Sequence, residues 1–286
     1  MKVLLHVNYH EGPGKMLEEL FDLAERNGCD GVELRWKYRF DDRTQSQYRE
    51  EVVRLKHLHP DMEIVFGACV DFCRGDRETV ERETSEFIEF MAWAKAHCGS
   101  TLFNFFTGGL TRKDTPYYEF DINGSGMAGE GDFERSAAGL RTIGDAAAKL
   151  GIRLALETHN NYLHDLVPAC RKLMDMTNHP AVGLNFDQGN IALNPKGGTV
   201  DSFFEALSDK VYYAHLKNVQ VVRGKNGGGY FITRLEEGCI NQRRVMQLLK
   251  KHLQGGVIAI EYPCPGDSFT AAKRDMNYLR ELLSEI

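Results

Sequence analysis

The seven cysteines of the chain include no Cys-x-x-Cys pair, the spacing that is typical of structural zinc sites. They are scattered over positions 29, 69, 73, 98, 170, 239 and 264. An odd number of scattered cysteines favours reduced thiols over a disulfide framework. We therefore expect a cytoplasmic protein without a structural zinc site.

Long apolar runs and blocks of basic residues are also missing. The N-terminal stretch "MKVLLHVNYHEG" is interrupted by His6 and Asn8, so it is too short and too polar for a signal peptide or a membrane span. The formal net charge is −6, and no Lys/Arg cluster supplies the cations that nucleic-acid binding requires. Both absences argue against membrane and nucleic-acid partners.

Short apolar runs recur along the 286 residues, and segments with helical periodicity lie between them. Residues 14–28, for example, place Leu17, Leu20 and Ala24 on one stripe and stop at Gly28. The apolar runs begin at Lys2, Gly31, Glu63, Thr101, Ile152, Val182, Val211 and Val257. Such alternation gives parallel strands, and eight units predict one α/β domain over residues 1–286, a single (β/α)₈ TIM barrel. A doubly wound open sheet is the competing architecture.

Two glycine-rich segments, at about residues 108–131 and 219–241, are longer than the other connections. Each follows a strand end, so in a barrel both would lie over the C-terminal face, where lids and binding loops are found. The alternative is that both segments are surface loops without a function.

The first segment contains "GSGMAG" at 124–129, which matches the dinucleotide-binding pattern G-x-G-x-x-G. In a dinucleotide-binding fold, a strand precedes this pattern and a helix follows it directly. Here the candidate strand "YYEFDI" is polar, and we expect the helix to begin only after Asp132. We therefore favour a lid over a dinucleotide site.

Potential metal ligands end each of the last four predicted strands: Glu157, Asp187, His215 and Glu261. In a parallel barrel these ends lie on one face, where three carboxylates would repel one another unless a divalent cation joined them. Three oxygen donors and one imidazole suit Mn²⁺, Mg²⁺, Co²⁺ or Zn²⁺. Taken singly, each residue could instead cap a helix or anchor a loop.

Other polar residues lie near the same strand ends. Lys217 is two residues after His215 and therefore on the same side of the strand, where it could bind substrate or form a salt bridge to a site carboxylate. Glu33, in "GVELR", is interpreted as an anchor for an arginine across the barrel mouth.

Several motifs together resemble those of the xylose isomerase-like TIM-barrel superfamily of sugar phosphate isomerases and epimerases. The similar pieces are "DGVELR", "LALETHNN", "VGLNFDQGN", "YAHLKN", "EEGCIN" and "IAIEYP". The resemblance implies that Glu157, Asp187, His215 and Glu261 are the metal ligands and that the two glutamates are also the catalytic acid and base.

The same resemblance suggests residues that bind substrate. "LETHNNYLHD" together with "HLKN" is similar to the 3-dehydroshikimate dehydratases, in which His159 would be an active-site group. Asn190 stands where many epimerases and AP endonucleases carry a histidine, and Arg223 lies two residues beyond the usual place of the epimerase arginine. With Lys217, these residues are the candidates for contact with substrate.

The sequence thus predicts a divalent-metal-dependent isomerase or epimerase of a small sugar-like carbonyl compound. Glu157 or Glu261 would remove a proton beside the carbonyl, and the metal would stabilise the resulting enediolate. Loss of a β-hydroxyl from the same species would make the enzyme a dehydratase of 3-dehydroshikimate or an inosose, which is the alternative. A non-catalytic sugar-binding barrel is a third hypothesis. The sequence is compatible with a homo-oligomer and does not identify the substrate.

Overall fold

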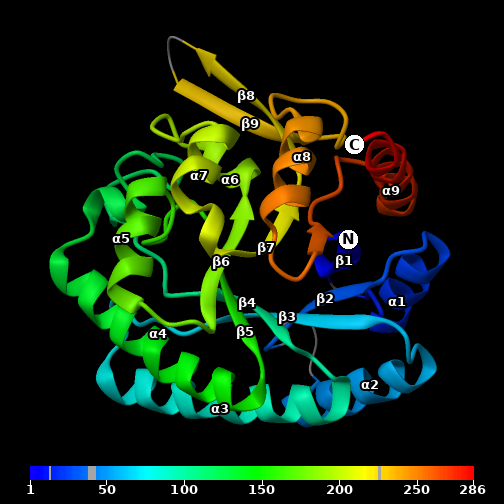
Figure 1. Cartoon of the computed structure of the whole chain (residues 1–286), viewed down its shortest axis with the longest axis horizontal. Coiled ribbons are helices and arrows are strands. Elements are labelled where there is room, and N and C mark those ends of the chain that lie inside the picture. Colours follow the sequence, from blue (N-terminus) through cyan, green and yellow to red (C-terminus); the bar gives the residue numbers. More distant parts are fainter. Residues whose placement is uncertain (13, 38–42, 225–226) are drawn as a thin grey trace.

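The computed structural model describes the chain except for residues 13, 38–42 and 225–226 (Figure 1). In this described part, eight parallel strands close into a barrel in the order β1, β10, β7, β6, β5, β4, β3, β2. The strands are β1 (Lys2–His6), β2 (Gly31–Arg35), β3 (Glu63–Cys69), β4 (Leu102–Phe106), β5 (Arg153–Glu157), β6 (Val182–Asp187), β7 (Val211–Leu216) and β10 (Val257–Ile260). All of them coincide with the predicted apolar runs. The TIM-barrel prediction is confirmed, and the open sheet is wrong.

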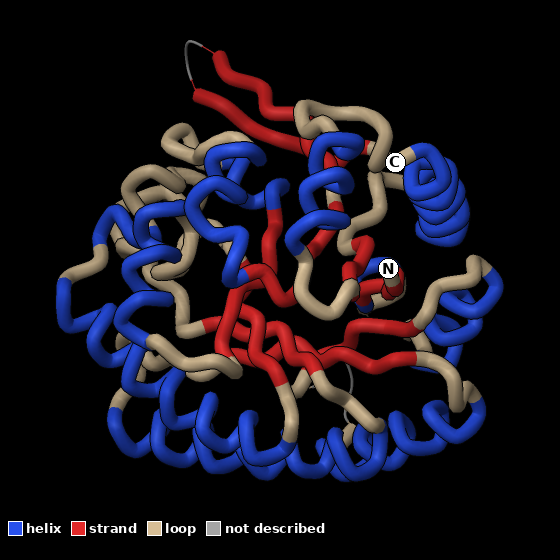
Figure 2. Tube along the Cα trace, viewed as in Figure 1, coloured by secondary structure: helices blue, strands red, loops and turns tan. Residues whose placement is uncertain are grey.

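Helices surround the strands and bury their apolar faces against the outside of the barrel (Figures 1 and 2). They are α1 (Leu17–Arg26), α2 (Gln45–Leu58), α3 (Arg77–Cys98), α4 (Glu130–Leu150), α5 (Val167–Thr177), α6 (Gln188–Leu193), α7 (Val200–Leu207), α8 (Gln242–His252) and α9 (Ser268–Glu285). The predicted stripe of α1 is confirmed, since Leu20 and Ala24 are fully buried. None of the described helices is both long and apolar enough to cross a membrane.

The inside of the barrel changes from apolar to polar along the strands. A separate buried cluster, which includes Leu4, Leu102, Ala155, Tyr213 and Ala259, fills the interior. Two residues further along each strand, the side chain points the same way because a strand has a period of two. The pairs are Leu4 and His6, Leu102 and Asn104, Ala155 and Glu157, Tyr213 and His215, and Ala259 and Glu261. The fold therefore sets a layer of polar side chains directly above an apolar floor.

The "GSGMAG" segment does not form a dinucleotide-binding turn. Gly124–Met127 is a short 3₁₀ helix, and residues 117–122 before it form turns rather than a strand. The prediction that the next helix begins after Asp132 is wrong. Helix α4 begins at Glu130, because the carboxylate of Asp132 reaches back to accept a hydrogen bond from the N–H of Gly129 at 2.8 Å.

The second long segment is more regular than its glycine content suggests. It forms an antiparallel hairpin of β8 (Asn218–Gly224) and β9 (Gly227–Thr233), which projects from the barrel (Figures 1 and 2). The ring of Tyr230 on β9 lies 6.2 Å from that of Tyr118 and 6.4 Å from that of Phe120, measured between centroids. The hairpin and the segment before α4 therefore contact each other.

Candidate metal centre and active site

The four predicted metal ligands converge at the carboxyl ends of the strands. Glu157 ends β5, Asp187 ends β6, His215 is the fifth residue of β7, and Glu261 directly follows β10. All four are buried, and they offer ligand atoms that lie within 4.8 Å of one another. Nδ1 of His215 is 3.2 Å from Glu157, 3.7 Å from Glu261 and 4.0 Å from Asp187. The strand register explains this, since Asp187 and His215 are paired across β6 and β7.

Lys217 forms the salt bridge that was one of its two predicted roles. Its ammonium nitrogen is 2.5 Å from Glu261 Oε2 and 2.7 Å from Asp187 Oδ2. In the protonation state that metal binding requires, with His215 neutral and Glu157, Asp187 and Glu261 all ionised, these carboxylates and the one ammonium would leave two negative charges in a buried place. Such a charge requires a compensating cation.

Asparagine side chains fix the carboxylates of this centre. The amide nitrogen of Asn190 lies 3.0 Å from Glu157 Oε1 and 2.9 Å from Asp187 Oδ2, so this predicted substrate contact faces the carboxylates. Asn190 reaches them because Asp187 is the N-cap of α6 and accepts the backbone N–H of Asn190 at 3.0 Å. Asn104 of β4 donates to the other oxygen of Glu157 at 2.7 Å.

The two glutamates have different electrostatic environments. Burial raises the pKa of Glu261 to about 8, and the carboxylates of Glu157 and Asp187 add to the rise while Lys217 opposes it. Burial would also raise the pKa of Glu157, but the neighbouring imidazole of His215 in its charged form, together with Lys217, holds that pKa well below its usual range. Of the two carboxyl groups, Glu157 is thus the more strongly favoured as an anion.

A cavity of about 520 Å³ opens above the centre. Of the four predicted ligands, Glu157 and Glu261 line it, whereas Asp187 and His215 do not. His159 also lines it, and its ring lies 5.7 Å from that of Phe106. A substrate in this cavity would therefore contact Glu157 and Glu261 rather than Asp187 and His215.

The remaining predicted contact, Arg223, lies in β8 and pairs with Gly228 of β9. Its side chain falls outside the described part of the chain. Sequence reasoning missed Asn8, which donates to Glu261 Oε1 at 3.4 Å and accepts from Arg35 at 2.8 Å. Arg35 itself pairs with Glu11 at 2.5 Å. Asn8 lies two residues after the end of β1, in the short 3₁₀ helix Val7–Tyr9, and its position near a strand end was the only signal for it.

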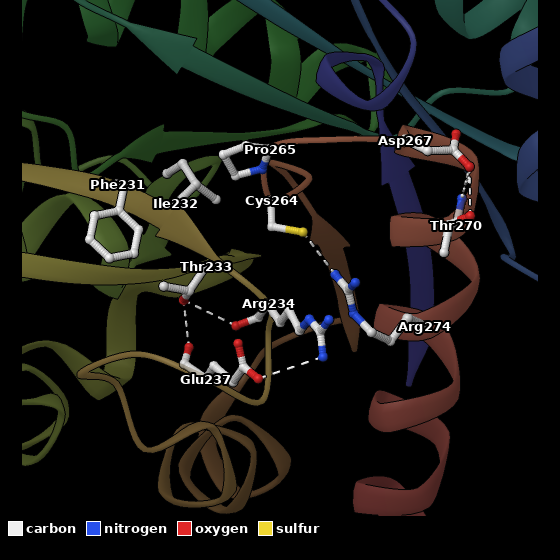
Figure 3. A pocket seen from close by; sticks show the side chains of 10 residues that line it. All are labelled: Phe231, Ile232, Thr233, Arg234, Glu237, Cys264, Pro265, Asp267, Thr270 and Arg274. Atoms are coloured by element: carbon white, nitrogen blue, oxygen red, sulfur yellow. Dashed lines mark hydrogen bonds and ion pairs between the residues drawn. The ribbon is translucent and has the colours of Figure 1, made fainter.

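A second pocket, of about 400 Å³, lies between β9, the segment after β10 and the start of α9 (Figure 3). None of the four predicted ligands lines it. Its arginines are already engaged, because Arg274 donates to the sulfur of Cys264 at 3.1 Å and Arg234 lies 3.6 Å from Glu237. This pocket carries no chemistry that resembles that of the barrel mouth.

The residues of the centre fit a divalent cation. Nδ1 of His215 is buried and makes no hydrogen bond within the described part of the chain, although it lies within 4.0 Å of three carboxylates. An orphaned buried nitrogen of this kind is costly unless a ligand completes it. The donor set of three carboxylates and one imidazole, and the residual charge, both match a hard or borderline divalent metal.

The comparison with protein families agrees with the fold and the motifs. Residues 21–282 match the family described as xylose isomerase-like TIM barrel, and the chain belongs to this family. The resemblance predicted from the strand-end motifs is confirmed.

Individual relatives are distant. An inosose dehydratase of Lacticaseibacillus casei is 29% identical over 89 residues, which are 31% of this chain and 29% of that protein. The match thus spans less than a third of the curated relative.

Solved structures share the fold over nearly the whole chain. The probable 3-DHS dehydratase AsbF of Bacillus anthracis is 20% identical, with a TM-score of 0.73 over 98% of this chain and 99% of that one. A D-allulose 3-epimerase from Methylomonas sp., in complex with D-allulose, is 15% identical, with a TM-score of 0.73 over 98% and 96%. A xylose isomerase-like TIM-barrel protein from Mycobacterium smegmatis, in complex with magnesium, is 17% identical, with a TM-score of 0.74 over 99% and 97%.

Proposed function

We propose that this protein is a divalent-metal-dependent isomerase or epimerase of a small, polyhydroxylated carbonyl compound. One observation carries the proposal: two carboxylates of one buried donor set, Glu157 and Glu261, line the same cavity. They belong to β5 and to the end of β10, which are separated in the barrel by β6 and β7. The two groups therefore approach a bound substrate from different directions, as a proton acceptor and a proton donor must.

Glu157, Asp187, His215 and Glu261 would hold the metal, for which Mn²⁺, Mg²⁺, Co²⁺ and Zn²⁺ are the candidates. When bound, such an ion polarises a carbonyl oxygen and stabilises negative charge that develops beside it. The chain's own residues then move the proton. One glutamate removes it from the carbon next to the carbonyl, and the other returns it, to the opposite face in an epimerase or to the adjacent carbon in an isomerase.

Neighbouring side chains would orient these two carboxylates. Asn104 and Asn190 donate to the two oxygens of Glu157, which would hold its carboxylate in one orientation. Lys217 and Asn8 do the same for Glu261. Lys217 is not among the residues that line the cavity, so it would act on the substrate through Glu261.

A dehydratase acting on 3-dehydroshikimate or an inosose is the second candidate, and His159 is the observation that favours it. Its Nδ1 donates to the carbonyl of Asn160 at 2.8 Å, while Nε2 makes no hydrogen bond to a described residue. A protonated Nε2 could assist departure of a β-hydroxyl after the same proton removal. The inosose dehydratase relative supports this reading over the 89 matched residues.

Deuterium incorporation tests the proposal. Protein reconstituted with Mn²⁺ and incubated in D₂O with ketohexoses should place deuterium on the carbon beside the carbonyl, because an exchangeable carboxyl group returns the proton. Mass spectrometry and proton NMR of the recovered sugar detect it.

Other outcomes of that experiment would contradict the first choice. An epimerised product without solvent deuterium would point to a shielded proton or a hydride shift. An unsaturated product with strong ultraviolet absorbance, formed from 3-dehydroshikimate or an inosose while every ketose stays unchanged, would identify the lyase. No conversion of any compound by metal-loaded protein would favour the non-catalytic sugar-binding barrel.

A further inference from the structure

Glu33, the third residue of β2, is a fully buried carboxylate outside the donor set of Glu157, Asp187, His215 and Glu261. We propose that Glu33 is a positioning residue that holds the imidazole of His215 with Nδ1 aimed at the three carboxylates. The inference rests on the proposed metal centre and goes beyond it, because it assigns a role to a residue that would not touch the metal.

The hydrogen bonds around Glu33 fix the direction of each donor. Oε2 of Glu33 lies 2.7 Å from Nε2 of His215 and 2.6 Å from the hydroxyl of Tyr213, and Oε1 lies 3.1 Å from the amide nitrogen of Asn104. An ionised carboxylate can only accept hydrogen bonds, so Nε2 of His215 must carry a hydrogen. Nδ1 is therefore the nitrogen that can release its proton and offer a lone pair to a metal.

The same geometry excludes a second metal site below the first. His6, Glu33 and His215 are close enough together to suggest one. However, Nδ1 of His6 accepts the backbone N–H of Asn8 at 3.1 Å, so its hydrogen is on Nε2, which faces Glu33 at 3.6 Å. Both imidazoles thus present N–H groups to Glu33, and the trio is a support for the metal centre.

The support extends to a second ligand. The amide nitrogen of Asn104 lies between Glu33 Oε1 and Glu157 Oε2, at 3.1 Å and 2.7 Å. Glu33 therefore restrains His215 directly and Glu157 through Asn104. Ligand histidines are commonly oriented by a carboxylate on their other nitrogen, and loss of such a partner typically lowers metal affinity by about 10- to 100-fold.

The tautomer of His215 is the direct test. Protein with ¹⁵N-labelled histidines, loaded with diamagnetic Zn²⁺, should give the long-range ¹H–¹⁵N pattern of an imidazole protonated at Nε2 and bound to metal through Nδ1. The resonance is assigned by its loss in His215→Gln. A pattern with metal on Nε2 would overturn the inference, and this measurement needs no change at Glu33.

Metal affinity provides the second arm. Glu33→Gln keeps the size of the side chain but presents an amide, and Zn²⁺ titration by calorimetry should give a dissociation constant about 10- to 100-fold higher. Tyr213→Phe is the matched control, because it removes another hydrogen bond to Glu33 and leaves the contact with His215, so its affinity should stay close to that of the unchanged protein.

The outcomes separate the two proposals. Unchanged Zn²⁺ affinity in folded Glu33→Gln would overturn the role of Glu33 alone. Equal losses in Glu33→Gln and Tyr213→Phe would show that Glu33 only satisfies buried polar groups, which also overturns it. A wild-type chain that binds no divalent metal at all would overturn the proposed function, and the inference with it.

Discussion

Replacing Glu261 by glutamine is expected to lower kcat by about 10²- to 10⁴-fold, the range that a positioned acid or base contributes. The variant keeps an oxygen for Lys217, which lies 2.5 Å from Oε2, and it keeps a neutral oxygen donor for a metal. What it loses is the group that can gain and release a proton. Steady-state kinetics with the substrate found in the screen, and Mn²⁺ titration of the same preparation, should show that turnover falls much further than metal affinity.

Glu63→Gln is the matched control for this change. Glu63 begins β3, at the amino end of the barrel, and pairs with Lys2 at 2.6 Å on the surface. The same loss of a carboxylate there should leave kcat unchanged. If Glu261→Gln instead lost metal and activity in equal proportion, Glu261 would be a ligand without a role in proton transfer.

Much of this site could be predicted because it follows from strand periodicity. Each apolar run marks a buried strand, and the polar residue that ends it must lie at the carboxyl face once the strands are parallel. Glu157, Asp187, His215 and Glu261 are all found by that rule without knowledge of which strands are neighbours.

The contacts that Glu33 and Lys217 make with the predicted ligands could not be predicted in the same way. Glu33 was expected to hold an arginine, and instead it contacts His215, which is 182 residues away in the chain. That contact depends on how far along the barrel axis the side chains of β2 and β7 lie relative to each other. No local sequence pattern specifies this relative position. The same limit applies to Lys217, for which a substrate contact and a salt bridge were equally compatible with the sequence.

The hairpin was missed for a different reason. The first strand alternates apolar and polar residues only in "VQV", the apolar run "YFI" of the second strand is short, and the glycine-rich stretch between them is typical of a loop. The extended structure of each strand is stabilised by the hydrogen bonds that pair β8 with β9, and the sequence of either strand alone does not indicate it.

Loss of metal from Asp187→Ala is the second large effect that we expect. Asp187 is fully buried, and both Lys217 and Asn190 donate to Oδ2. Removing it deletes one of the four proposed donors and one of the negative charges that would hold the metal. Dialysed protein reconstituted with Mn²⁺ should contain about one equivalent of metal in the wild type and almost none in the variant, because affinity depends on the complete ligand set.

Asp209→Ala controls for the loss of an aspartate. Asp209 lies on the surface and pairs with Arg171 at 3.1 Å, so this variant should retain the full equivalent of metal.

A second variant separates metal binding from helix capping. Asp187 Oδ1 caps α6, and loss of an N-cap costs about 1 kcal/mol of stability on its own. In Asp187→Asn the side-chain oxygen can still accept the N–H of Asn190, so α6 should remain capped, whereas an amide NH2 group, which cannot bind a metal, replaces Oδ2. Low metal content in both variants, with Asp187→Asn unfolding close to the wild-type temperature, is therefore the expected result. A full equivalent of metal in either variant would remove Asp187 from the ligand set and leave its pairing with Lys217 as its role.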